Sequence, residues 1–121
     1  MYGHVDLVPP SRGDGDGSTL ISMDRAFGAL PDVEWVKRML PRAKIVFGSN
    51  NRGVQARMCA EGSGFAVLPC PLGDATPGIR RIDLGDAPPG RDVWIGYHRD
   101  LRRVARLRAL LDVTVEALTK A

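Results

Sequence analysis

A turn of polar residues between a predicted strand and a predicted helix carries the best candidate binding chemistry in this chain. Ser49 and Asn50 place a hydroxyl and an amide where the helix begins, and Asn51 follows as a weaker adjunct. The first N–H groups of a helix have no acceptor within the helix, so this end of a helix attracts anions. The turn therefore suits a carboxylate group of a small ligand. The alternative is that Ser49 only caps its own helix.

Other candidate residues follow the neighbouring predicted strands. Asp24 and Arg25 come directly after a short apolar strand, and Pro69 and Cys70 come after another. Ligands of parallel α/β sheets bind beyond the carboxyl ends of the strands, so all four residues are candidate ligand contacts. Arg25 could pair with an anionic group, although a solvated loop charge is the commoner role. Cys70 has no basic neighbour in the sequence that would activate its thiol, which favours a small buried residue.

The sequence shows no catalytic or metal-binding pattern, and we expect neither an enzyme nor a cofactor. The two histidines, His4 and His98, lack further ligands at the spacing of a zinc site. Asp14-x-Asp16-x-Ser18 resembles the start of a calcium-binding loop, but the glycine and the glutamate that such a loop needs later are missing. A Gly-x-Ser-x-Gly elbow, a P-loop and a dinucleotide fingerprint are also absent.

The elements that must position these residues alternate between strands and helices after residue 19. We expect strands at 20–23, 43–47, 65–68, 79–84 and 92–98, with a Pro- and Gly-rich loop before residue 79. Helices are expected at 32–40 with Asp32 as N-cap, from the polar turn to Gly62, and from 101 to about 118. The apolar run Ile45–Phe47 is typical of a strand covered on both faces. This order predicts an α/β fold with a mostly parallel sheet flanked by helices.

Composition is that of one small globular domain. Apolar residues make up 44% and charged residues 26% of the 121 residues, and no run approaches the ~20 apolar residues of a membrane span. Residues 1–19 are rich in glycine and proline, so apart from a short strand within Tyr2–Val8 we expect a flexible segment, followed by a domain at 20–118. Two cysteines make no disulfide scaffold and no signal peptide is evident, so we expect a cytoplasmic protein without a membrane partner.

The excess positive charge lies entirely in the last segment. Residues 1–98 hold 11 basic and 11 acidic side chains, whereas residues 99–121 hold 6 basic and 3 acidic ones. The arginines of this segment are Arg99, Arg102, Arg103, Arg106 and Arg108. They could contact phosphate groups, which makes a small basic nucleic-acid-binding protein one alternative function. A solvated helix face is the commoner role of such a cluster.

Two segments of the sequence resemble a known family. The first is Ile45-Val46-Phe47-Gly48-Ser49-Asn50, then a helix, then Ala60-Glu61-Gly62-Ser63-Gly64-Phe65-Ala66-Val67-Leu68-Pro69. The second is Asp92-Val93-Trp94-Ile95-Gly96-Tyr97-His98-Arg99-Asp100-Leu101-Arg102, followed by a long basic helix. In this order and spacing they are similar to the effector-binding domain of LysR-type bacterial transcriptional regulators. The resemblance covers about residues 20–118.

The resemblance implies a type II periplasmic-binding-protein-like fold, in which two α/β lobes enclose a cleft. Residues 20 to about 90 would form the second lobe, while the 92–98 strand and the final helix would return to the first. A small effector, expected to be an anionic metabolite, would bind in the cleft and modulate transcription through the geometry of a homo-oligomer. In the family DNA is read by a winged helix-turn-helix, and neither this domain nor most of the first lobe is found before residue 20.

A second hypothesis follows from the apolar face of the final helix. Its residues recur at three- and four-residue steps: Leu101, Val104, Leu107, Leu111, Val115 and Leu118. This face must be covered, and a second copy of the chain is the simplest cover. The chain would then be a dimerisation fragment that modulates a full-length regulator. Trp35 and Trp94 are interpreted as core or interface aromatics.

Overall fold

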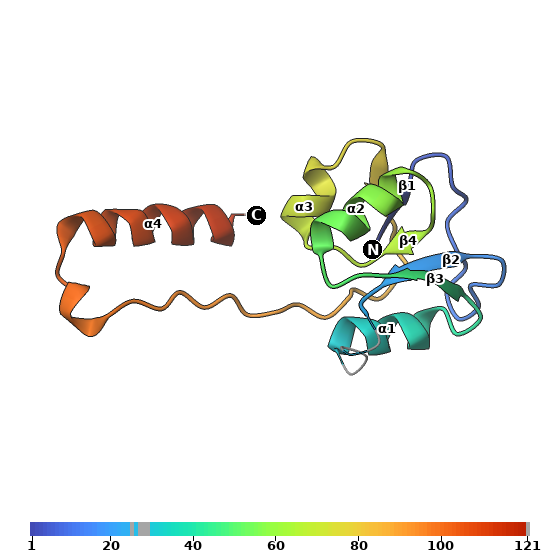
Figure 1. The fold of residues 1–121 in the computed structure, drawn as a ribbon, viewed down its shortest axis with the longest axis horizontal. Coiled ribbons are helices and arrows are strands. Elements are labelled where there is room, and N and C mark those ends of the chain that lie inside the picture. Colours follow the sequence, from blue (N-terminus) through green and yellow to red (C-terminus); the bar gives the residue numbers. More distant parts are fainter. Residues whose placement is uncertain (25, 27–29, 121) are drawn as a thin grey trace. The chain divides into compact units, whose positions relative to one another are not determined.

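The computed structural model of the protein describes residues 1–24, 26 and 30–120, and it divides the chain into two compact units, Met1–Pro89 and Gly90–Ala121. The first unit is built on a five-stranded sheet (Figure 1). In spatial order the strands are β3 (Lys44–Gly48), β2 (Thr19–Ser22), β4 (Phe65–Ala66), β1 (Tyr2–His4) and β5 (Ile79–Arg81). Helix α1 (Pro31–Met39) covers one face, and α2 (Arg52–Ala60) and α3 (Cys70–Ala75) cover the other. The predicted α/β class is confirmed.

The sheet is mixed, which corrects the expectation of a mostly parallel one. β2 runs parallel to β3 and to β4, as the intervening helices α1 and α2 require. β1 lies between β4 and β5 and is antiparallel to both, with Tyr2 opposite Ala66 on one side and Arg81 on the other. β1 is therefore part of the compact unit Met1–Pro89. The expected division into a 1–19 segment and a 20–118 domain stays a prediction.

Successive residues of the central strands point to opposite faces of the sheet, and this alternation divides the core into two layers. Leu20 and Phe65 pack on the α1 side against Trp35. Their neighbours Ile21 and Ala66 pack on the opposite side, in a cluster that includes Ala56 and Cys59 of α2. Trp35 is thus a core residue, as expected. Burial raises the pKa of the Cys59 thiol to about 11, so this cysteine is a packing residue.

Tyr2 ties β1 to α3 and β5 through its ring and its hydroxyl. The hydroxyl donates to Asp74 Oδ1 at 2.8 Å, and Arg81 Nε donates to the same carboxylate oxygen at 2.8 Å. Burial and the neighbouring Asp74 raise the pKa of Tyr2 to about 12. Gly73 lies directly against the tyrosine ring, so that a Cβ at this position would overlap the ring atoms. The close approach of α3 to β1 therefore requires glycine at position 73.

Three expectations about individual elements need correction. β3 is an edge strand and is not covered on both faces: among the described strands only β2 pairs with it, and its Ile45 and Val46 side chains are 52% and 49% exposed. Helix α1 begins at Pro31 with Leu30 as N-cap, and Asp32 lies one residue inside it. The expected loop before residue 79 contains α3, which a proline in its first turn initiates.

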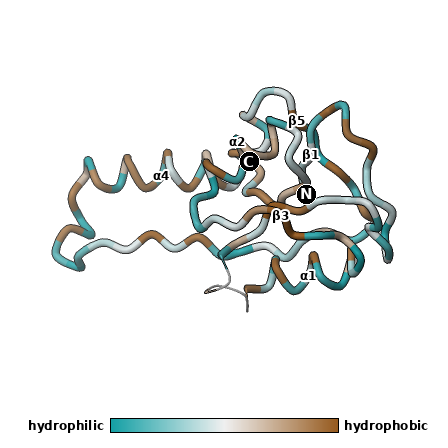
Figure 2. The backbone as a smooth tube through the Cα atoms, turned by 45° about the vertical axis from the view of Figure 1, so that its right-hand side comes forward, coloured by the Kyte–Doolittle hydropathy of each residue, from teal (hydrophilic) through white to brown (hydrophobic). Residues whose placement is uncertain are grey.

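The second unit contains an extended segment, a short 3-10 helix (η2, Arg99–Leu101) and the helix α4 (Ala105–Thr119). Within the described residues, 92–98 form no strand, because no other strand lies beside them to complete a ladder. Trp94 is 87% exposed here, so it is not a core residue, and its alternative role as an interface aromatic stays a prediction. The predicted terminal helix is confirmed from Ala105 onward, but Leu101, where it was expected to begin, ends the separate 3-10 helix η2. Hydrophobic residues recur along α4 (Figure 2). Of the described residues of α4, none is buried.

The contact between Gly73 and Tyr2 predicts the effect of Gly73→Ala. In an exposed helix this change stabilises by up to about 1 kcal/mol. Here the added methyl overlaps the Tyr2 ring, so we expect a loss of about 1–3 kcal/mol in the free energy of unfolding, measured by urea denaturation. Gly96→Ala, where a Cβ would meet nothing within 4 Å, is the matched control. Equal stability of the two variants would contradict the close packing of α3 on β1.

Candidate functional site

The carboxyl ends of β2 and β3 meet and bring three of the predicted site residues together. The backbone N–H of Ser49 donates to Ser22 O at 3.0 Å, which ties the turn after β3 to the end of β2. The backbone N–H of Asp24 donates to Asn50 Oδ1 at 3.2 Å. Asp24, Ser49 and Asn50 therefore share one edge of the sheet, where the rule for α/β folds places a ligand.

Helix α2 starts at this edge, and its N-cap is Asn51. Asn51 Oδ1 accepts a hydrogen bond from the backbone N–H of Val54 at 3.1 Å. Ser49 Oγ accepts from the backbone N–H of Asn51 at 3.2 Å, one residue before the helix. Asn51, and not Ser49, is therefore the residue that caps α2.

Arg52, in the first turn of α2, links this edge to the remaining elements. Its Nη2 donates to Asp32 Oδ2 at 2.6 Å, and its Nη1 donates to Val67 O at 2.9 Å. The Asp32 side chain is 8% exposed and the Arg52 side chain 24%. A charge-assisted pair of this kind therefore joins α1, α2 and the end of β4 at a largely buried point.

Gln55 completes this polar connection one turn along α2. It is 0% exposed, and its Nε2 donates to Ser49 O at 2.5 Å and to Ser22 O at 3.2 Å. Its Oε1 accepts from Arg52 Nη1 at 3.1 Å. We call Asp32, Arg52 and Gln55 the strand-end network, because Arg52 and Gln55 donate to carbonyl groups at the ends of β2, β3 and β4, and Asp32 pairs with Arg52.

Sequence reasoning missed the strand-end network as part of the site. One signal was present: an arginine in the first turn of a helix is unfavourable against the helix dipole, so it needs a carboxylate nearby. Nothing in the sequence indicates that this carboxylate is Asp32, 20 positions away.

The remaining candidates lie apart from this group or outside the described residues. Pro69 is the N-cap of α3, and Cys70 begins that helix with an exposed side chain, which corrects its expected burial. The Cys70 carbonyl accepts from the Tyr2 hydroxyl at 3.4 Å. Within the described structure no hydrogen bond joins either residue to Ser49 or Asn50. Arg25 lies outside the described residues, so its role stays a prediction.

A small cavity lies beneath the edge of the sheet. It has a volume of about 20 Å³ and is lined by residues of β2, β4 and α1 together with Arg52. This volume admits about one water molecule, so it cannot enclose a metabolite. A ligand at Ser49 and Asn50 would therefore sit on the sheet edge rather than inside this cavity.

Among the described residues no three histidine, cysteine or carboxylate side chains gather as a metal site. No helix among the same residues is long and apolar enough to cross a membrane.

Comparison with known proteins gives one match. A family model described as the LysR substrate binding domain matches residues 8–119. The match covers both units and starts 12 residues before the 20–118 range of the resemblance. No curated protein and no solved structure gave a significant match.

The strand-end network predicts a large effect of Arg52→Met. This change removes the Arg52 guanidinium from the largely buried carboxylate of Asp32, so we expect a loss of about 3 kcal/mol in the free energy of unfolding, measured by urea denaturation. Arg52→Met combined with Asp32→Leu should recover part of this loss, because the buried carboxylate is then absent as well. Arg57→Met, an exposed change on the same helix, is the control. A loss as small as that of Arg57→Met would show that the pair does not hold these elements together.

Proposed function

Because the chain belongs to the LysR substrate-binding domain family, we propose that it is the effector-sensing part of a LysR-type transcriptional regulator and acts in the cytoplasm. Its role is then regulatory rather than catalytic. The effector is a small anionic metabolite that binds at the carboxyl ends of β2 and β3. The observation that carries this assignment is the meeting of Ser49, Asn50 and the first turn of α2 at one edge of the sheet.

The hydrogen bonds at this edge support an anionic ligand. Ser49 Oγ already accepts from the N–H of Asn51, and its hydroxyl hydrogen is available to donate to a ligand. Asn50 Oδ1 already accepts from the N–H of Asp24, which leaves the amide NH₂ as a donor. The first-turn N–H groups of α2 add further donors. A ligand group that only accepts hydrogen bonds, such as a carboxylate, matches these donors.

The charges around the edge determine how strongly an anion is held. Arg52 is the nearest described cation on α2, and Asp32 compensates its charge. Asp24 is exposed and places a negative charge beside Asn50. Binding would therefore depend on directed hydrogen bonds and on the helix N-terminus, with Arg25 as the predicted additional cation. Pro69 and Cys70 remain proposed contacts at the end of β4.

We expect Ser49→Ala and Asn50→Ala each to weaken binding of a carboxylate effector by ~1 kcal/mol or more, because each removes one donor. A panel of small mono- and dicarboxylic acids is first screened by the shift in thermal unfolding temperature. The dissociation constant of the strongest acid is then measured by titration calorimetry. Ser63→Ala, near the opposite end of α2, is the matched control. Equal affinity in all three variants would refute the site.

The effector would act on transcription through the geometry of a homo-oligomer, and α4 favours self-association. Its apolar stripe holds Leu107, Leu111, Val115 and Leu118, none of which is buried in the described structure. A helix that leaves such a stripe in water gains stability when a partner covers it. The same observation supports the alternative function, in which the chain pairs with a full-length regulator and modulates it.

We expect the chain to be a dimer in solution and Val115→Glu with Leu118→Glu to shift it to monomer, because two charges would enter the covered stripe. Light scattering coupled to size exclusion measures the mass. Val113 lies on α4 outside the stripe and is 66% exposed, so Val113→Glu should leave the dimer intact. A monomeric unmodified chain, or equal effects of the two changes, would contradict pairing through this stripe.

A further inference from the structure

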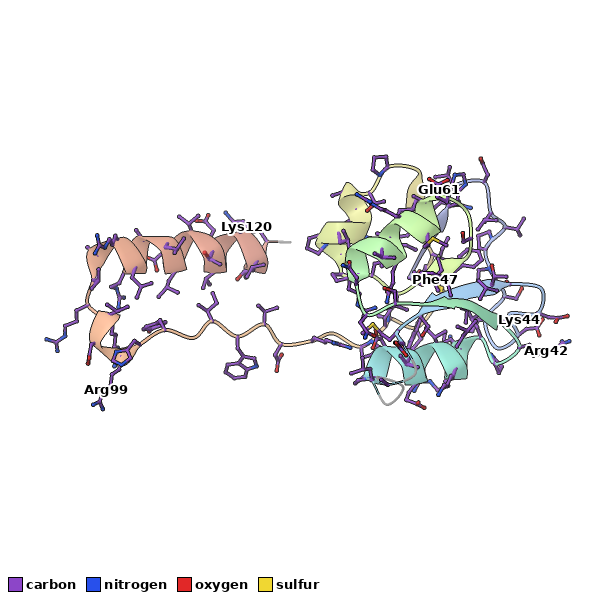
Figure 3. The ribbon with its side chains drawn as sticks, in the orientation of Figure 1. Arg42, Lys44, Phe47, Glu61, Arg99 and Lys120 are labelled. Atoms are coloured by element: carbon purple, nitrogen blue, oxygen red, sulfur yellow. The ribbon has the colours of Figure 1, made fainter. Side chains whose placement is uncertain are left out.

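The turn between the extended segment and α4 carries an arginine-lined hollow. We define the arginine hollow by the residues that line it, which are Arg99, Asp100, Arg102, Arg103 and Arg108. Its volume is about 640 Å³, and it opens to solvent. Arg99 lies at this turn, with its side chain directed away from α4 (Figure 3). Four arginines and one aspartate thus line the same space.

Most arginines of the hollow have no ion-pair partner among the described residues. In the first unit Arg38, Arg42, Arg52 and Arg81 each form an ion pair with an aspartate, whereas other described arginines of that unit, such as Arg57, do not. In the arginine hollow Arg99 approaches Asp100 at 3.9 Å, and Asp100 also lies 3.4 Å from His98 Nδ1. Within the described residues no carboxylate pairs with Arg102, Arg103 or Arg108. The hollow therefore keeps a net positive charge.

The start of α4 adds to this positive potential. Val104 is its N-cap and offers no side-chain acceptor, and the first turn holds no acidic residue. The N-terminus of a helix carries a partial positive charge, so cations there are unfavourable and anions favourable. Arg106 and Arg108 nevertheless follow closely after this end. An anion in the hollow would offset both the helix charge and the repulsion among the guanidinium groups.

We propose that the arginine hollow binds the phosphate backbone of duplex DNA. Guanidinium groups donate paired hydrogen bonds to phosphate oxygens, and this fork geometry makes arginine well suited to phosphate. The hollow is far larger than one phosphate group and is lined from a ten-residue stretch, which suits successive phosphates along a strand better than a single small anion. Contacts of this kind do not depend on the base sequence. The hollow would therefore add affinity and orient the protein on the duplex, without recognising bases. The proposal does not depend on the effector site.

The test compares arginines inside the hollow with one outside it. Binding of a fluorescent duplex of arbitrary sequence is followed by anisotropy between about 50 and 200 mM salt. Arg103→Ala and Arg108→Ala should each weaken binding and lower the slope of log K against log salt by about 0.9, the value for one lost phosphate contact. Arg106 is on the same helix but does not line the hollow, so Arg106→Ala should leave the slope unchanged. Circular dichroism checks that the helix content of all variants is equal.

Each other outcome would overturn the proposal. Absence of binding to the duplex at the lowest salt would remove it. Equal effects of Arg103→Ala, Arg106→Ala and Arg108→Ala would show attraction by overall charge, without a site. Tripolyphosphate is titrated separately by calorimetry. If it binds through Arg103 and Arg108 while the duplex does not, the hollow is a site for a free oligophosphate and not for DNA.

Discussion

The strand-end network is the constraint on which the first unit depends. A strand that ends inside a fold leaves carbonyl groups beyond its ladder, and each of them needs a donor. Gln55 supplies donors to β2 and to the turn after β3, and Arg52 supplies one to the end of β4. A buried polar network is stable only when its members are satisfied together. The first turn of α2 is therefore fixed relative to all three strand ends, and with it the positions of Ser49 and Asn50.

Much of the first unit could be predicted from the sequence, because its central part follows local rules. β2, α1, β3, α2 and β4 occur in the expected order, with apolar spacing and polar turns that mark them. Gly62, in the left-handed region at φ +80°, ends α2 as expected. The edge position of β3 could not be predicted, because an apolar run such as Ile45–Phe47 looks the same in a covered and in an uncovered strand.

The features that the sequence concealed depend on distant partners. The short strand expected within Tyr2–Val8 is confirmed as β1 at Tyr2–His4, but its place in the sheet follows from the Tyr2 contacts with Asp74 and Arg81. Residues 92–98 have strand-forming composition, yet a strand exists only when another completes its ladder. The candidate site likewise combines a local feature with one that depends on distant residues. The polar turn was visible in sequence, whereas the Asp32–Arg52 pair appears only once α1 and α2 are packed on the two faces of the sheet.

The antiparallel strand β1 sets the order in which the first unit can fold. The β2–α1–β3–α2–β4 region joins neighbours in sequence, so its contacts close short loops early and at low entropic cost. β1 instead contacts groups as far as 79 positions away, such as Arg81, and has no place until β4 and β5 are formed. The first strand of this unit in chain order is therefore the last to enter the sheet. Completion of the core becomes a late, long-range step that fixes α3 and β5 together.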